Sequence, residues 1–100
     1  MLKHIVMWRL KPQALGHSKE KNLAEMRVRL SMLPDLIPEI REFVFGTNVV
    51  DDPFAMDCVL VSSFDDEAAL AVYQAHPEHI KVKAFIGEVC EQRAVVDAVV

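Results

Sequence analysis

The sequence predicts an α+β fold with a four-stranded antiparallel sheet, in the ferredoxin-like order β-α-β-β-α-β. Three patterns support this prediction. Apolar residues alternate with a period of two in residues 2–10 and 56–64, as expected for strands. They recur at three- and four-residue spacing in residues 23–33, as in an amphipathic helix. Residues 91–100 are apolar and rich in valine, which favours a final strand.

The first predicted strand, residues 2–10, has apolar side chains on both faces. His4 is the exception, because it lies in line with Val6 and Trp8 on the face that should pack against helices. A buried imidazole needs hydrogen-bond partners. His4 is therefore either a satisfied core residue or part of a pocket.

One helix is predicted between the first two strands. Residues 11–17 are typical of a loop, and Ser18 is a plausible N-cap for a helix that ends before Pro34. A tight connection then leads to a second strand within residues 39–50, bent or bulged at Gly46.

The second half of the chain repeats this alternation. After a turn, residues 56–64 form the third predicted strand, and Asp65 or Asp66 can cap the helix that follows. A break divides that helix, and its second part is expected to stop at Gly87. The last strand runs from about residue 91 to residue 100.

The break gathers one phenol and two imidazoles. Pro77 lacks a backbone N–H, so a helix that carries Tyr73 should stop near Ala75, and Pro77 can begin the next helix. His76 then lies at or beside the cap, and His79 lies in the first turn. Histidine is the side chain best suited to acid or base catalysis near neutral pH. The alternative is that these residues only cap two helices and fill a corner.

Composition limits the classes of function. The chain has 100 residues, enough for one domain, and a net charge of −4, which argues against nucleic acid as a ligand. Nothing near residue 1 resembles a signal peptide or a membrane span. Cys58 and Cys90 lack metal-site or redox spacing, so two buried free thiols in a reducing cytoplasm are expected, with a single disulfide as the alternative.

The apolar fraction of 52% is high for so short a chain. Helices can cover only one face of the predicted sheet, which leaves a second apolar face exposed. We therefore expect a homodimer in which two sheets pack face to face and form an α/β barrel. The residues expected on this face are Ile5, Met7, Val59, Val61 and Val96.

The order and spacing of several short segments resemble the stress-responsive A/B barrel (Dabb) family over essentially the whole chain. The resemblance implies one Dabb domain over residues 1–100 and a dimeric α+β barrel. The segments are Lys3-His4-Ile5-Val6, Leu33-Pro34, Ser63-Phe64-Asp65-Asp66, Tyr73-Gln74-Ala75-His76-Pro77-Glu78-His79 and Arg93-Ala94-Val95-Val96-Asp97.

One branch of this family, olivetolic acid cyclase, closes a linear polyketide by aldol condensation without a cofactor. The resemblance implies that Tyr73 and His79 match its catalytic pair and that His4 matches a histidine of its pocket. The sequence departs from the cyclase at two positions. Cys58 stands where the cyclase has a histidine, and Arg93 stands where it has an apolar wall residue.

The catalytic hypothesis places a small aromatic or polyketide-like ligand between sheet and helices. His79 would remove a proton next to a carbonyl, Tyr73 would hold the enolate oxygen, and His4 would assist. The alternatives are a non-catalytic dimer that binds a ligand or protects against stress, and a cofactor-independent monooxygenase. The expected substrate-binding residues are Val6, Trp8, Cys58, Leu60, His76, Ile80 and Arg93.

No metal or cofactor is predicted. His76, Glu78 and His79 lack the order His-Glu-x-x-His, and Pro77 breaks the helix that would present two ligands on one face. The chain has only three glycines and no glycine-rich loop for a nucleotide. The alternative is Mg²⁺, which would need oxygen ligands such as backbone carbonyls.

Overall fold

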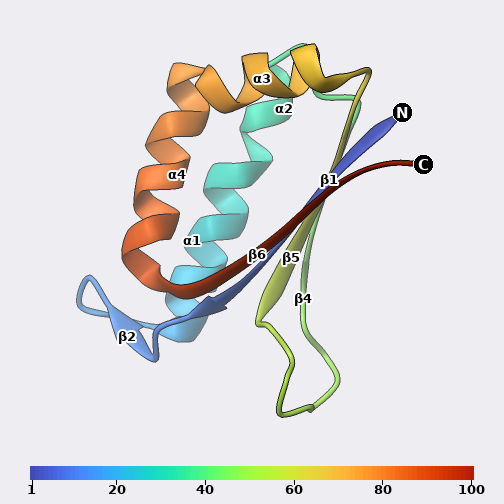
Figure 1. Ribbon diagram of the computed structural model, residues 1–100. Helices are drawn as coiled ribbons and strands as arrows, with labels where there is room; N and C mark the ends of the chain where they lie inside the picture. Colours follow the sequence, from blue (N-terminus) through green and yellow to red (C-terminus); the bar gives the residue numbers. More distant parts are fainter.

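The computed structural model describes residues 1–100 as a four-stranded antiparallel sheet with all of its helices on one face (Figure 1). The strand order is β4-β5-β1-β6, so the first strand lies in the middle, between β5 and β6. This is the predicted ferredoxin-like arrangement, which is confirmed. The main elements are β1 (Leu2–Leu10), α1 (Lys19–Ser31), α2 (Leu33–Leu36), β4 (Glu42–Thr47), β5 (Cys58–Phe64), α3 (Glu67–Ala75), α4 (Pro77–Val89) and β6 (Cys90–Val99).

The predicted loop after β1 is wrong in part, because it contains a small hairpin. Strands β2 (Gln13–Ala14) and β3 (His17–Ser18) pair across a two-residue turn. Leu15 has φ 55° and Gly16 has φ 75°, the two positive values that a tight hairpin of the type I′ class requires. Leucine rarely adopts this conformation, so the turn has no recognisable signature in the sequence.

The helix boundaries follow their caps. Ser18 accepts a hydrogen bond from the backbone N–H of Lys21, and Asp66 accepts one from that of Ala69. The helix that carries Tyr73 ends at Ala75, and Pro77 begins the next one, as predicted. His76 lies between them as the N-cap of α4, where its Nδ1 accepts a hydrogen bond from the backbone N–H of Glu78 at 3.1 Å.

Other boundaries differ from the prediction. Helix α4 does not stop at Gly87 but continues to Val89, since Gly87 keeps helical backbone and the chain becomes extended only at Cys90. A short helix, α2, forms around Pro34 where a plain connection was expected. Strand β4 lies within the predicted range 39–50, but its register against β5 passes through Gly46 without a bulge.

The core lies between the sheet and the helices. The face of β1 that points to the helices is almost fully buried and contributes Val6, Trp8 and Leu10, and Tyr73 packs onto it from α3. Burial of large apolar side chains is the main stabilising term in such a domain. None of the helices is long and apolar enough to cross a membrane.

The opposite face of the sheet is apolar and uncovered by any helix (Figure 1). In the strand register, Ile5 lies opposite Val61 on one side and Val96 on the other. Val96 is 59% exposed and Met7 is 40% exposed. We call this surface the open face, defined by Ile5, Met7, Val44, Val59, Val61, Ala94 and Val96.

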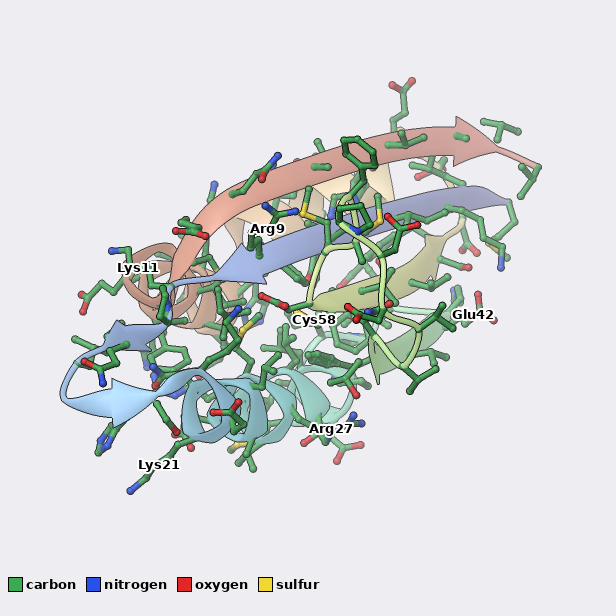
Figure 2. The ribbon with its side chains drawn as sticks, turned by 90° about the horizontal axis from the view of Figure 1, so that it is seen from below. Arg9, Lys11, Lys21, Arg27, Glu42 and Cys58 are labelled. Carbon is green, nitrogen blue, oxygen red and sulfur yellow. The ribbon has the colours of Figure 1, made fainter.

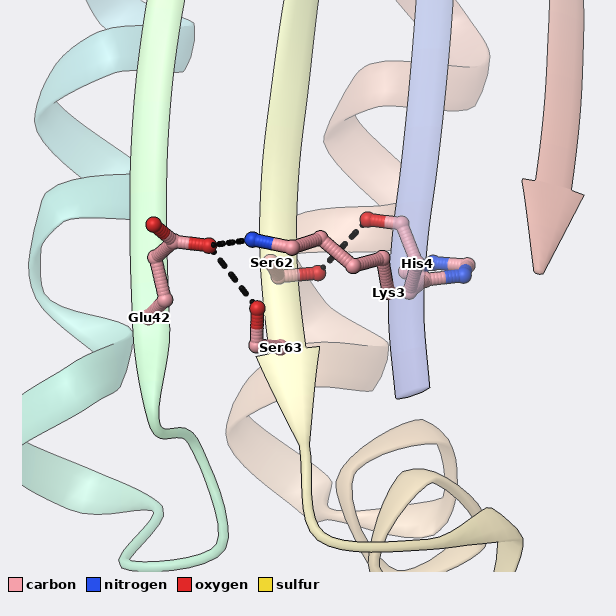
Figure 3. A network of polar contacts seen from close by, with 5 residues as sticks. All are labelled: Lys3, His4, Glu42, Ser62 and Ser63. Carbon is pink, nitrogen blue, oxygen red and sulfur yellow. Dashed lines mark hydrogen bonds and ion pairs between the residues drawn. The ribbon is translucent and has the colours of Figure 1, made fainter. Parts of the chain in front are cut away.

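A polar cluster closes one end of the open face (Figure 3). Lys3 Nζ lies 2.6 Å from Glu42 Oε1, and the hydroxyl of Ser63 donates to the same oxygen at 2.8 Å. The hydrogen bond from Lys3 and that from Ser63 lower the pKa of Glu42. The cluster joins β1, β5 and β4, so it marks their register.

Candidate functional site

A cavity of about 430 Å³ lies between the sheet and the helices, a size suited to a small organic molecule. Its wall combines an apolar part with a set of polar side chains from β1, β6, α3 and α4. The apolar part is Val6, Trp8, Leu30, Leu60, Val82 and Ile86. The other lining residues are His4, Tyr73, Gln74, His79, Lys83, Gly87, Cys90, Glu91, Gln92 and Arg93.

Seven of the residues proposed from the sequence meet in this cavity: His4, Val6, Trp8, Leu60, Tyr73, His79 and Arg93. Cys58, His76 and Ile80 do not line it. Cys58 is buried, with its sulfur 3.9 Å from the carbonyl oxygen of Trp8. His76 caps α4, and Ile80 is 53% exposed on the outside of that helix. Ile80 follows His79 directly, and adjacent helical residues point in different directions.

The structure adds residues that the sequence reasoning missed. Lys83 and Ile86 follow His79 by four and seven positions on α4, so they share its face of the helix. This spacing is visible in the sequence and could have identified them. Gln92 and its neighbours line the cavity because β6 passes beside β1, and no local pattern indicates which strand residues face the pocket mouth.

Tyr73 and His79 form the centre of the site. Their ring centroids are 4.2 Å apart, and the rings are tilted by 38°. Burial raises the pKa of the Tyr73 phenol, so the phenol is protonated at neutral pH. Its hydroxyl has no hydrogen-bond partner in the protein. Every fully buried side-chain nitrogen or oxygen does have a partner, so the Tyr73 hydroxyl is not fully buried. The hydroxyl therefore reaches the accessible space of the cavity, where it can donate to a ligand.

His79 is a neutral imidazole, the form that can accept a proton. Its Nδ1 lies 3.3 Å from the carbonyl oxygen of Gln74, and a carbonyl only accepts, so Nδ1–H is the donor. In the neutral ring the lone pair is then on Nε2. Burial lowers the pKa of His79, and although the Gln74 hydrogen bond opposes this, the charges of Lys83, His4 and Arg93 lower it further. His79 is therefore neutral at physiological pH.

His4 is both a satisfied core residue and a pocket residue, the two readings that the sequence left open. It is 4% exposed and lines the cavity. Its Nδ1 hydrogen-bonds the carboxylate of Asp97, which lies directly opposite it on β6. The hydroxyl of Ser62 donates to the backbone carbonyl of His4 at 2.9 Å (Figure 3). Because a carboxylate accepts, the proton of a neutral His4 ring lies on Nδ1.

The two cysteines are free thiols. Burial raises the pKa of Cys58 to about 12 and that of Cys90 to about 11. Both are protonated at neutral pH, and a protonated thiol is a poor nucleophile. The side chains also form no cluster of three or more His, Cys, Asp or Glu residues that could hold a metal ion.

A ferredoxin-like sheet with a polar pocket beneath its helices defines a class of small α/β barrel domains. The family model described as "Stress responsive A/B Barrel Domain" (Dabb) matches residues 2–100. The chain therefore belongs to the Dabb family, which confirms the resemblance found in the sequence.

The relatives agree with this assignment. An uncharacterised protein of Streptomyces coelicolor is 30% identical over 79 residues, which is 79% of each chain. A dimeric ferredoxin-like protein of unknown function from Bacteroides fragilis is 30% identical, with a TM-score of 0.79 and coverage of 97% of this chain and 93% of the other. A dimeric ferredoxin-like protein of unknown function from Thermobifida fusca is 25% identical, with a TM-score of 0.86 and coverage of 99% and 90%.

Two structural neighbours are named as enzymes. One is a hydroxynitrile lyase from Passiflora edulis, 21% identical with a TM-score of 0.85 over 99% of this chain and 92% of that chain. The other is an antibiotic biosynthesis monooxygenase, 19% identical with a TM-score of 0.74 over 100% and 98%. At these identities the likeness shows the fold alone.

Proposed function

We propose that this Dabb protein binds a small aromatic or polyketide-like molecule in its cavity and performs cofactor-free acid/base chemistry on it. In this reaction Nε2 of His79 takes a proton from a carbon next to a carbonyl group. The electrons of the broken C–H bond move onto the carbonyl oxygen, and the Tyr73 hydroxyl donates a hydrogen bond to that oxygen. The resulting enolate can attack a second carbonyl of the same molecule, as in a polyketide cyclisation.

The observation that supports the proposal is the pairing of a neutral imidazole with an unpartnered phenol on one cavity wall. His79 has one nitrogen held by the Gln74 carbonyl and the other free, and the Tyr73 hydroxyl has no protein partner. A base and a hydrogen-bond donor are the two groups that enolisation needs. His4, fixed by Asp97, would orient the ligand or share its proton.

We also propose that the protein is a homodimer whose two open faces pack together. The row of apolar side chains on this face supports the proposal, because such a surface is unusual for a small monomer. The relatives from Bacteroides fragilis and Thermobifida fusca are described as dimeric. The site lies on the other side of the sheet, so the dimer would leave its cavity accessible.

The competing function is a non-catalytic dimer in which the same groups only stabilise the corner. The observation in its favour is the packing of Tyr73 among Phe43, Phe64 and His4, with ring centroids 5.0 to 6.2 Å away. Such a cluster stabilises a fold whether or not a ligand binds. The third alternative, a cofactor-independent monooxygenase, rests on a fold neighbour named as an antibiotic biosynthesis monooxygenase and has no separate support in this site.

Hydrogen exchange at carbon separates these functions. We would incubate the protein with ethyl acetoacetate in D₂O and follow loss of the α-proton signal by NMR, in parallel with His79→Ala and Tyr73→Phe. A positioned base contributes roughly 10²- to 10⁴-fold to such a rate. We expect the His79→Ala protein to lose most of the acceleration over buffer, and the Tyr73→Phe protein to lose a smaller part.

His17→Ala is the matched control, because His17 is an exposed histidine on the small hairpin. It should exchange the ester as fast as the original protein. If the original protein does not exceed buffer, or if His79→Ala is as fast as His17→Ala, the proposed reaction is wrong. If the original protein shows no exchange activity and Tyr73→Phe has a lower melting temperature, the non-catalytic function is favoured, in which these residues only stabilise the corner.

A further inference from the structure

We infer that the cavity is specific for a small carboxylate, whose charged end is held by Arg93 and Lys83 while its apolar body lies on Val6, Trp8 and Leu60. The inference rests on the cavity of the proposed function as a ligand site, and it does not depend on the proposed reaction.

The first argument is the distribution of unpaired cations. The chain has 11 Lys and Arg residues. Eight of them have a side-chain ion pair or hydrogen bond. The three that have neither are Lys21, Lys83 and Arg93, and two of these line the cavity. The protein has a net charge of −4, so acidic partners are plentiful. Two of the three unpaired cations nevertheless lie at the cavity, where they are free to bind an anion.

The second argument is that the cavity carries little negative charge of its own. Glu91 is the only acidic residue among its lining. Asp97, also on β6, does not line the cavity and is hydrogen-bonded to the lining residue His4. An anion that enters would therefore meet two cations without displacing an existing ion pair. Guanidinium groups bind carboxylates through two parallel hydrogen bonds, which gives orientation as well as affinity.

The third argument is position. Lys83 lies four residues after His79 on the same face of α4. Arg93 lies opposite Trp8 in the register of β6 against β1. The cations thus flank the Tyr73 and His79 pair, and the charge of Arg93 acts on both of those residues. If Arg93 and Lys83 hold the carboxylate of a ligand, the neighbouring carbons of that ligand lie near His79 and against the apolar side chains of the cavity wall.

Binding of matched ligands tests the inference. We would measure dissociation constants of hydrocinnamate and of the neutral hydrocinnamide by calorimetry at low salt. The carboxylate should bind about tenfold tighter or better, and added salt should reduce the difference. The preference should disappear in Arg93→Gln combined with Lys83→Gln. Arg93→Lys should keep part of it, because the charge remains while the planar fork is lost.

Lys21→Gln is the control, since Lys21 loses the same charge but extends away from the body of the molecule at the start of α1 (Figure 2). It should keep the full preference. Equal binding of acid and amide, a preference that survives the double substitution, or no binding of the acid would each overturn the inference. Carboxylate binding without exchange of ethyl acetoacetate would refute the proposed reaction and leave this inference standing.

Discussion

The two faces of the central sheet use their polar groups differently. On the face covered by helices, His4 is hydrogen-bonded to Asp97, while the Tyr73 hydroxyl and one nitrogen of His79 have no hydrogen-bond partner in the protein. On the open face, Lys3 and its partners bond only to one another (Figure 3). Lys3 and His4 are neighbours in sequence but point to opposite sides. One strand thus contributes to the cavity on one face and to the apolar open face on the other.

The largest expected effect comes from placing a charge on the open face. Val96→Asp should raise the dimer dissociation constant at least about 100-fold, because an unpaired carboxylate would be buried twice across the two-fold axis. Light scattering after size-exclusion chromatography would show a monomer. Val28→Asp is a matched control, since Val28 on α1 is 55% exposed and Val96 is 59% exposed. A dimeric Val96→Asp protein would exclude this face as the interface.

The next effect compares the polar groups of the two faces. Asp97→Ala leaves the buried His4 without its partner and should lower the free energy of unfolding by about 1–2 kcal/mol. Glu42→Ala breaks an ion pair whose side chains are 32% and 44% exposed, so its effect should be smaller. Urea unfolding at pH 7 measures both. A larger loss of stability in Glu42→Ala than in Asp97→Ala would mean that the polar cluster on the open face stabilises the fold more than the His4–Asp97 hydrogen bond.

The covered face should also respond to acid. Burial lowers the pKa of His79 below the ordinary value of 6.5. Its contribution to stability is therefore complete above pH 6.5 and is lost as the pH falls through the lowered pKa, because the unfolded chain takes up the proton first. Melting temperatures between pH 7 and pH 5 should fall less for His79→Gln than for the original protein. His17→Gln, at an exposed histidine, should not change the slope.

The same titration should appear in the proposed exchange reaction, since only neutral His79 can accept a proton. The acid limb of the exchange rate should lie below pH 6.5, with a tenfold loss for each unit below the lowered pKa. A limb above pH 6.5 would assign the base to another group.

The smallest effect concerns the cavity wall. Gly87 lies inside α4 and lines the cavity, and a Cβ built there meets nothing within 4 Å. Gly87→Ala should therefore raise the free energy of unfolding by about 0.5–1 kcal/mol, because alanine loses less backbone entropy in a helix. Thermal or urea unfolding measures this gain. A loss of stability would show that the helix needs glycine at this position.

The fold was predictable because its signals are periodic and independent of one another. Alternation in β1 and β5, the caps at Ser18 and Asp66, and the break at Pro77 each indicate an element without reference to the rest. The errors lie where local signals are weak. The Leu15 turn uses an unfavourable residue, and Gly87 is a helix breaker by propensity that the surrounding packing overrides.

The site was predictable only in part, because a pocket joins residues distant in sequence. His4 was identified as a polar residue in line with apolar ones on the first strand, and Tyr73 and His79 from their positions around the helix break at Pro77. The partner Asp97 was missed, since only the register of β6 against β1 places it beside His4. Cys58 was expected in the pocket but does not line the cavity, although it lies opposite Trp8, which does. Alternation gives the face of the sheet, and it does not indicate that the Cys58 side chain is buried in the core without reaching the cavity.

The two ends of the chain meet at one end of the sheet, where the backbone N–H of Val100 donates to the carbonyl of Met1 at 3.2 Å (Figure 1). A short linker could join them, and new ends could be opened in the exposed segment 48–54 between β4 and β5. Such a circular permutant would keep every strand pairing while β1 moved to the interior of the chain. It would carry fusion partners at the loop instead of at the end of the sheet where β1 begins and β6 ends.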